Sequence, residues 1–499
     1  MAEHLYQALL ATITYANIIA LLFGSLVGIV VGILPGLGPM VGMVVLLPFT
    51  FALDPGVALS LLLGVFCGGY FGGAIPAILM RTPGVPSSLI TSFDGFPLTQ
   101  KGEAQTALSA ALVGSFSGGI ISVFILMFLA PILAHVAASF GPPEYFAAGL
   151  FGVTLVVMAY RDRLAQGLVL LGLGLWISTV GIDGPTLVPR FCFGTLAMQN
   201  GLHLVPVCLG LFGIGQTLIL AERRILQTES MSLTRKTLDF SKIMGALRYW
   251  KSLVMSGVIG TFVGLLPGTG SILASFLSYE TVKRTSKDPE AFGKGTPEGC
   301  LASEAGNNAV PAGAMIPLLT LGIPGDALSA VLLGVFTING IYPGPLLLVK
   351  EPVLINTLYL SMLFINVAAF LMLAIWLRPF AMVVRVSNTL LAAVIMVLSL
   401  VGIYAVNTRL FDAGVAIVMG VLGYILLRLE WPVVNLVMGV VLGEILEERL
   451  RESLSISEGN PLIFLQRPIS LCLFIATALI VVIPLILDWR RHRRSNAAG

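Results

Sequence analysis

The sequence contains little charge. Only 11% of its 499 residues are Asp, Glu, Lys or Arg, whereas a soluble chain carries about 25%. Uncharged runs therefore recur, and each reaches the roughly 20 residues that a bilayer-spanning helix needs. They cover residues 5–53, 55–80, 104–134, 252–279, 352–377, 386–408 and 468–487. We expect an all-α polytopic integral membrane protein with about 11–13 spans, broken and re-entrant helices included.

Catalytic and metal-binding patterns are also missing. The five cysteines include no CxxC pair, and the four histidines lie apart from one another. Such scattered residues predict no metal or haem site. The chain contains neither HExxH nor a Walker-type GxxxxGKS/T, and no GxSxG in a strand–turn–helix setting. We expect no enzymatic activity, no metal or organic cofactor, and no nucleic-acid partner.

Basic residues concentrate at four places, which are 161–163, 222–251, 378–385 and 490–494. Because positively charged loops tend to remain in the cytoplasm, we place all four there. An even number of spans is expected between Arg163 and the central loop, and again between Arg385 and the C-terminus, so these places can all lie on the same side of the membrane. The same count puts the N-terminus on the outer side of the membrane and the C-terminal tail in the cytoplasm.

Two Pro/Gly motifs occur twice in the same order. "LPGLG" (34–38) precedes "IPAILMRTPG" (75–84), and "LPGTG" (266–270) precedes "IPLLTLGIPG" (316–325). The two prolines of the second motif lie seven residues apart in both copies. Identical order and spacing indicate an internal duplication. The long apolar helices after the two copies should end on opposite sides of the membrane, which is typical of the inverted repeats of secondary transporters.

The duplication divides the chain into four segments. Residues 1–160 form the first repeat, with a broken helix and a Pro/Gly hairpin, and residues 252–385 form the second repeat. Residues 161–251 contain linking helices and the basic cytoplasmic loop, and residues 386–499 contain the C-terminal helices and the basic tail. Charges at helical spacing in 444–460 further predict a short amphipathic helix on the outer face.

The repeated LPGxG motif should unwind its helix near the middle of the membrane, because proline removes a backbone donor and glycine relaxes the backbone. Unpaired peptide groups cost several kcal/mol each in hydrocarbon, so such a break persists only where protein or a polar cavity satisfies it. Exposed N–H groups at a half-helix end suit an anion, and exposed carbonyl groups suit Na⁺. We therefore expect the two breaks to form one binding site. The alternative is a pair of kinks that serve helix packing alone.

Polar side chains beside the motifs complete the expected site. Hydroxyl and amide groups can hold a carboxylate or an alkali ion, although they can also join helices without a ligand. The residues expected to bind the substrate are Pro35, Gly36, Gly38, Thr82, Pro83, Gly84, Ser87, Ser88, Pro267, Gly268, Thr269, Gly270, Ser271, Asn307, Asn308, Pro324 and Gly325. The residues considered for ion coupling are Asn307, Asn308, Glu304 and Asp326. The simpler role of Asp326 is the N-cap of the next helix, and Glu304 could equally be interfacial.

Three stretches of the sequence resemble one transporter family. They are "GILPGLGP", "GGAIPAILMRTPGVPSSLITSFDGFPLTQKGEA" and the pair "GLLPGTGS" and "SEAGNNAVPAGAMIPLLTLGIPGDALSAVLLG". In these motifs the chain is similar to the large membrane subunit of the tripartite tricarboxylate transporters, the TctA family. The resemblance extends over roughly residues 15–445.

The resemblance implies a carrier of the bacterial inner membrane that works with a small membrane subunit (TctB-like) and a periplasmic solute-binding protein (TctC-like). It implies symport of citrate or a related carboxylate, driven by an ion gradient, with Na⁺ as the usual coupling ion. H⁺ carried by Glu304 or Asp326 is the alternative coupling ion. Two other functions stay open: an ion-coupled carrier of another class that works alone, and a non-transporting membrane scaffold or enzyme.

Overall fold

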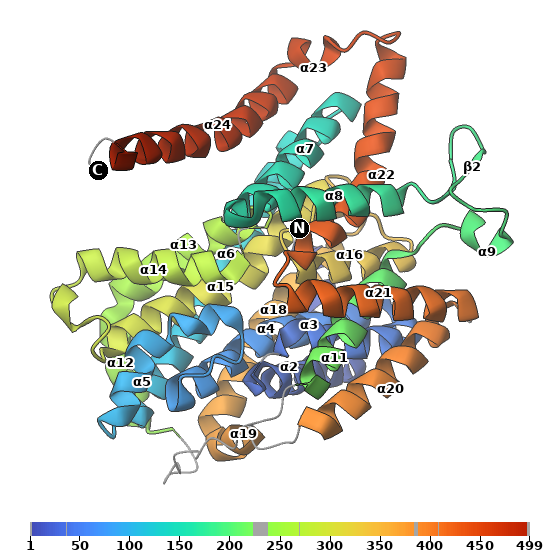
Figure 1. Ribbon diagram of the computed structural model, residues 1–499. Helices are drawn as coiled ribbons and strands as arrows, with labels where there is room; N and C mark the ends of the chain where they lie inside the picture. Colours follow the sequence, from blue (N-terminus) through green and yellow to red (C-terminus); the bar gives the residue numbers. More distant parts are fainter. Residues whose placement is uncertain are drawn as a thin grey trace.

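The computed structural model describes residues 2–35, 37–222, 238–268, 270–383, 388–407 and 409–496. It is helical almost throughout (Figure 1), and in these ranges one small sheet pairs β1 (Gly181–Ile182) with β2 (Pro189–Arg190). Seven described helices are long and apolar enough to cross a membrane. They are α2 (Tyr15–Ile33), α4 (Pro55–Met80), α6 (Ala104–Ala137), α7 (Pro142–Ala159), the run from α10 through α11 (Leu204–Glu222), α18 (Pro352–Ile375) and α21 (Leu410–Arg428). The expectation of an all-α polytopic membrane protein is confirmed.

Shorter or more polar helices complete the fold. The first half adds α1 (Ala2–Thr12), α3 (Gly38–Leu46), η1 (Leu47–Ala52), η2 (Pro86–Leu89), α5 (Ser92–Gln100), η3 (Arg161–Arg163), α8 (Leu164–Ser178) and α9 (Leu196–Gln199). The middle adds α10 (Leu204–Cys208), the π-helical turn η4 (Leu209–Ile214), α11 (Gly215–Glu222), α12 (Phe240–Ala246), η5 (Leu247–Tyr249), α13 (Trp250–Leu265), α14 (Gly270–Thr285), η6 (Pro289–Ala291), α15 (Pro297–Leu321), α16 (Ala327–Ile338), α17 (Leu347–Lys350) and α19 (Leu377–Val383). The C-terminal part adds α20 (Asn388–Asn407), α22 (Val433–Ile456), α23 (Ile463–Gln466) and α24 (Pro468–Asn496).

The first LPGxG motif reverses the chain. α2 runs parallel to α4, whereas α3 runs back along α4 in the opposite direction. The contacts that fix these directions are Gly28 with Val65, Gly32 with Gly69, Pro39 with Gly69 and Gly42 with Val65. α2 and α3 thus form a re-entrant hairpin, where a straight broken span would have carried α3 to the far side.

The second motif builds the same hairpin from α13 and α14. α13 lies parallel to α15, through contacts of Gly260 with Gly306 and of Gly264 with Val310. Ser252 near the start of α13 and Ser286 after the end of α14 both donate to the carboxylate of Glu298, over 2.6 and 2.7 Å. Because Glu298 begins α15, the chain has returned to the side from which α13 started.

The two repeats run in opposite directions. α4 and α18 are parallel, α6 and α15 are parallel, and α6 crosses α18 antiparallel. The pairs that fix this are Gly56 with Leu354, Ser60 with Ser361, Gly114 with Leu301, Gly118 with Ala305, Phe116 with Phe370 and Gly119 with Asn366. The corresponding helices α4 and α15 therefore point in opposite directions, and the prediction of inverted repeats is confirmed. The proposed segment boundaries stay a prediction.

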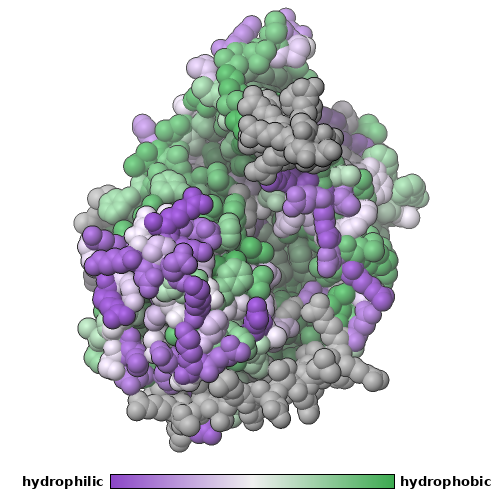
Figure 2. Space-filling model, turned by 60° about the vertical axis from the view of Figure 1, so that its left-hand side comes forward, coloured by the Kyte–Doolittle hydropathy of each residue, from purple (hydrophilic) through white to green (hydrophobic). Residues whose placement is uncertain are grey.

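Described basic stretches gather at helix ends on one side of the bundle. The contacts that join these ends are Arg163 with the Leu429 carbonyl (3.1 Å), Arg428 with Glu222 (3.1 Å) and the Leu238 N–H with the Ala374 carbonyl (3.0 Å). We call residues 161–163, 238–251, 286–298 and 374–378 the basic face. Hydrophilic side chains form a patch on the molecule in Figure 2, and hydrophobic ones cover much of the rest. Residues 223–237 and Arg385, also counted as basic landmarks, lie outside the described residues.

The opposite side, which we call the hairpin face, carries residues 181–199 and 444–460. The segment with β2 and α9 projects from the helical body in Figure 1. Two ion pairs fasten it to α22, Arg190 with Glu447 (2.5 Å) and Arg451 with Asp183 (3.0 Å), while Arg451 also pairs with Glu447 within α22 (2.6 Å). Residues 444–456 are helical as predicted, but they continue α22, which runs unbroken from Val433 to Ile456, and do not form a short helix of their own. No glycine or proline interrupts residues 444–456, so the spanning helix extends beyond its apolar part.

Candidate functional site

A fully buried carboxyl group, that of Glu304 on α15, is the centre of the most polar cluster among the predicted residues. Five neutral groups donate to its two oxygens, from Ser88 (3.1 Å), Thr91 (2.5 Å), Ser115 (3.4 Å), Asn307 (3.2 Å) and Asn308 (3.1 Å). We call these six residues the Glu304 cluster. Burying a carboxyl group is costly unless hydrogen bonds or a cation compensate it, so five converging donors indicate a built site. Both repeats contribute to it.

The two asparagines of the Glu304 cluster have fixed orientations. Each donates its side-chain N–H to Glu304 Oε2, and the reverse orientation would set its oxygen against a carboxyl oxygen. Both Oδ1 atoms are buried and have no hydrogen-bond partner in the described part of the chain. Buried oxygens without donors are rare in proteins and call for a bound water or ion. Carbonyl-type oxygens are also the ligands that hard cations prefer.

The carboxyl and amide groups of the Glu304 cluster come from the second repeat alone, and the first repeat has no counterpart to them. Counted back from Pro317 and from the corresponding Pro76, Glu304 matches Leu63 in α4. In the same way Asn307 and Asn308 match Phe66 and Cys67. Among the described residues, the duplicated scaffold therefore carries one cluster that combines a buried carboxyl group with side-chain amides.

The Pro-Gly turns lie against the breaks, in the same way in both copies. Gly84 packs on the carbonyl oxygen of Gly32, and Gly325 packs on that of Gly264, with no room for a Cβ at either contact. In the second copy the Gly268 N–H also donates to the Gly325 carbonyl over 2.8 Å. Each Pro-Gly turn therefore lies beside the helix that ends at the preceding LPGxG motif.

Each returning half-helix begins at a glycine beside open space. Gly38 and Gly270 both have φ +69°, and a Cβ built on either would meet no atom within 4 Å. Left-handed backbone of this kind is readily adopted by glycine alone. The first N–H groups of α3 and α14 lack partners within their helices and carry partial positive charge. Such ends favour an anion.

The two hairpin tips approach each other at Tyr70 on α4. Tyr70 follows Gly69, on which Pro39 of the first tip packs, and its side chain is hydrogen-bonded to Ser271 at the start of α14. Asp326 is close enough for charge interaction with Tyr70. Adjacent residues of α4 thus contact the two tips, whose prolines Pro35 and Pro267 lie 232 residues apart in the sequence.

Asp326 has the simpler of its two expected roles. Its carboxylate accepts the Ser329 N–H over 2.8 Å, and its own N–H donates to Ser329 Oγ over 2.8 Å, which makes a reciprocal cap on α16. Arg81, the C-cap of α4, is exposed.

The other predicted residues divide into three groups. Four prolines lie in the tips and turns between helices: Pro35, Pro83, Pro267 and Pro324. The hydroxyls of Thr82 and Ser87 are buried, have no partner among the described residues and lie outside the Glu304 cluster. Gly36 and Thr269 lie outside the described residues.

Thr91, Ser115 and Tyr70 were not predicted. Thr91 follows Ser88 by one helical turn, so helical spacing could have indicated it. Ser115 and Tyr70 stand alone in uncharged runs, and only the packing of α6 and α4 places them.

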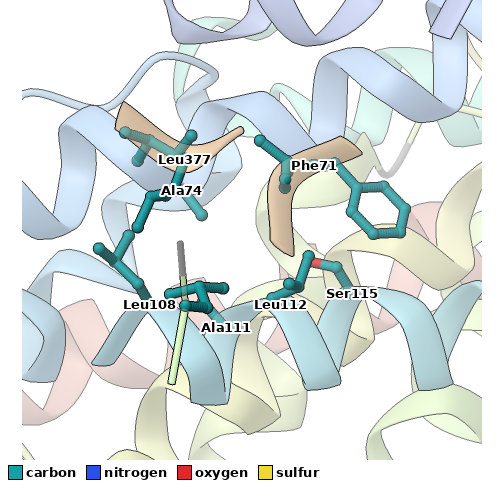
Figure 3. Close-up of a pocket in the computed structure, with 10 residues that line it drawn as sticks. Phe71, Ala74, Leu108, Ala111, Leu112, Ser115 and Leu377 are labelled. Atoms are coloured by element: carbon teal, nitrogen blue, oxygen red, sulfur yellow. The ribbon is translucent and has the colours of Figure 1, made fainter. Parts of the chain in front are cut away.

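A small cavity adjoins the Glu304 cluster at Ser115 (Figure 3). Its volume is about 20 Å³, enough for about one water molecule, and its other lining residues, among them Phe71, Ala74 and Leu112, are apolar. The cavity is therefore too small for a di- or tricarboxylate.

Comparisons with known proteins agree with this architecture. One relative from Agrobacterium vitis, named "Uncharacterized 52.8 kDa protein in TAR-I ttuC' 3'region", is 35% identical over 90% of this chain and 89% of its own length. A second from the same organism, named "Uncharacterized protein in TAR-II ttuC' 3'region", is 36% identical over 48% of this chain and 98% of its own length. No solved structure matches the chain. The model of the family described as "Tripartite tricarboxylate transporter TctA family" matches residues 18–438. Inverted repeats, paired re-entrant hairpins and this match over most of the sequence lead to one conclusion: the chain belongs to the TctA family, the multi-pass membrane subunits of tripartite transporters that also contain a small membrane subunit and a periplasmic binding protein.

Proposed function

We propose that the chain imports a di- or tricarboxylate such as citrate across the bacterial inner membrane, by symport with Na⁺, as the large permease subunit of a binding-protein-dependent tripartite transporter. Membership of the TctA family supports carboxylate transport. The Glu304 cluster is the observation that carries the ion coupling, because an ionisable side chain at membrane depth is seldom retained without a functional role.

In this proposal the Glu304 cluster holds the coupling ion. Asn307 and Asn308 supply the two unpartnered Oδ1 atoms, and Glu304 supplies the negative charge that favours a cation. With one cluster per chain, we expect one such ion site.

The carboxylate binds between the hairpin tips. The N-terminal ends of α3 and α14 offer N–H groups, and Ser271 and Tyr70 offer hydroxyls. The two sites are linked through residues 84–91, because Gly84 lies on the first hairpin while Ser88 and Thr91 bond Glu304. An ion that orders the Glu304 cluster therefore also positions the turn beneath one tip.

The basic face lies in the cytoplasm, as the positive-inside rule favours. The N-terminus and the hairpin face are then periplasmic, the C-terminus is cytoplasmic, and the binding protein delivers its carboxylate to the hairpin face.

Uptake of labelled di- and tricarboxylates into vesicles that hold all three subunits tests the proposal, with a sodium gradient or a proton gradient imposed separately. We expect sodium-driven uptake that falls at least about tenfold in Glu304→Gln, which loses the charge without changing the shape. A tenfold change corresponds to about 1.4 kcal/mol. Glu298→Gln is the matched control, because Glu298 lies on the same helix outside the Glu304 cluster.

Other outcomes identify the alternatives. Uptake driven by a proton gradient alone would assign H⁺ as the coupling ion. Undiminished uptake without the binding protein would indicate a carrier that works alone. The absence of any uptake, with no stabilisation by carboxylates, would favour a scaffold.

A further inference from the structure

A short segment of the basic face, residues 238–251, presents two different sides. Leu238 and Ala246 are buried, and α12 packs on α6 and α15. The Leu238 N–H donates to the carbonyl of Ala374 over 3.0 Å, which fixes the segment to the end of α18. The segment is therefore held firmly along one side.

The other side exposes an apolar stripe. Its members are Phe240 (73% exposed), Met244 (51%), Leu247 (43%) and Trp250 (61%), spaced three or four residues apart as on one side of a helix. The stripe continues along α13 through Val254 (46%) and Phe262 (54%). Because α13 enters the membrane within an uncharged run, the stripe joins directly onto lipid-facing surface.

Basic side chains flank the stripe. Lys242, Arg248 and Lys251 are exposed, and residues 240–251 contain no acid. Within the described ranges none of the three forms an ion pair with an acidic residue, and Asp239 caps α12 through the Ser241 N–H at 3.0 Å. The Arg248 guanidinium lies 4.7 Å from the centre of the Tyr249 ring, and Lys251 Nζ lies 5.8 Å from that of Trp250.

An exposed apolar stripe with flanking bases and aromatic rings has the composition of a helix that lies in the headgroup layer. Neutral lipid would cover the apolar stripe but would offer no anion to the three basic side chains, which form no ion pair with any described residue. An anionic lipid surface covers the apolar stripe and also pairs with the basic side chains. Each basic residue at such a surface strengthens binding by about 1 kcal/mol, which is about fivefold in the binding constant.

We propose that residues 240–251 form an anionic-phospholipid binding surface in the leaflet next to the basic face, with Lys242, Arg248 and Lys251 holding the headgroups. The 3-10 turn η5 connects α12 to α13, the first arm of the second re-entrant hairpin. Bound lipid therefore holds the base of the hairpin whose tip carries Gly268. This binding does not depend on the proposed transport activity.

Fluorescence quenching of Trp250 tests the proposal in the full-length chain. The other four tryptophans are replaced by phenylalanine (Trp176→Phe, Trp376→Phe, Trp431→Phe and Trp489→Phe). Vesicles contain phosphatidylglycerol and phosphatidylcholine in a fixed ratio, and an equal amount of bromine is carried by one lipid or by the other. We expect quenching by brominated phosphatidylglycerol to correspond to a concentration of this lipid around Trp250 that is about fivefold or more above its share of the vesicle. This enrichment should decline as salt screens the charges.

Two sets of substitutions make the test specific. The preference for phosphatidylglycerol should disappear, while quenching by both lipids persists, in the triple variant Lys242→Gln, Arg248→Gln and Lys251→Gln. The single variant Arg248→Gln should reduce the preference. Lys283→Gln, Arg284→Gln and Lys287→Gln together form the control, because these bases lie among acids near the end of α14. Equal quenching by the two lipids in the parent protein would overturn the proposal. No quenching by either lipid would overturn it too, because protein or water would then cover the stripe.

Discussion

At the scale of single residues, the glycines of the two tips differ in what they need. Gly268 has φ +76°, and a Cβ there would lie 2.5 Å from the Val156 Cα. Gly270 has φ +69° but faces open space. The first glycine is required by both conformation and close packing, and the second by conformation alone.

This difference predicts graded effects of alanine. Gly270→Ala should lower stability by about 1–2 kcal/mol, the usual cost of left-handed backbone in an alanine. Gly268→Ala should cost clearly more, because the backbone of α7 would have to shift. Thermal unfolding of the purified chain measures both. Gly172→Ala is the control, since Gly172 has open space and no left-handed backbone, and it should be neutral or slightly stabilising. Equal losses for Gly268→Ala and Gly270→Ala would contradict the close packing at Val156.

Residue chemistry could be predicted from the sequence only in part. Asn307, Asn308 and Ser88 stand in polar motifs and do meet at Glu304. Ser115 shows no local signal, because a single serine in an apolar helix is common. Its role depends on the packing of α6 along α15, which no short-range pattern encodes.

At the scale of elements, the sequence predicted where the helices break and that some segments are re-entrant, but not that the chain turns back at the LPGxG motifs themselves. Proline and glycine mark the break, and the same residues suit a kink or a reversal. The direction is decided by distant contacts, such as that of Pro39 with Gly69. The end of α22 was misjudged for a related reason, because residues 444–456 are polar yet continue the helix into the ion pairs of the hairpin face.

Those ion pairs predict a pH dependence. The Thr186 hydroxyl, and then Arg451 and Arg190, hold the pKa of Asp183 below its ordinary value of 3.8. A carboxyl group with a lowered pKa stabilises the fold above its unfolded pKa, and this contribution is lost as the pH falls through the folded pKa. We therefore expect the β1–β2 segment to become more sensitive, below about pH 4, to a protease that is active in both acidic and neutral solution. Asp183→Asn should be sensitive already at neutral pH and show no further change on acidification. A wild-type segment that resists protease equally at pH 6 and pH 3 would contradict this role.

At the scale of the whole molecule, inverted duplication brings two re-entrant hairpins together from opposite sides. The order and spacing of the motifs made this arrangement predictable, because a repeated motif and an odd difference in span number imply inversion. Two features were not predictable, because both depend on how α4, α6 and α15 pack. They are the approach of the two tips at Tyr70 and the position of the Glu304 cluster. The duplication produces a symmetric arrangement of helices. The Glu304 cluster makes it asymmetric, because its carboxyl and amide groups have no counterpart in the first repeat.

The proposed transport mechanism requires that the Glu304 cluster is a single cation site. Binding of radioactive sodium to the purified chain, without its partner subunits, tests this claim directly. We predict saturable binding of about one ion per chain, as one cluster of oxygen ligands allows. The binding should be lost in Glu304→Gln and in Asn308→Ala and retained in Glu298→Gln. Sodium binding in Glu304→Gln that equals that of the wild-type chain would contradict the account.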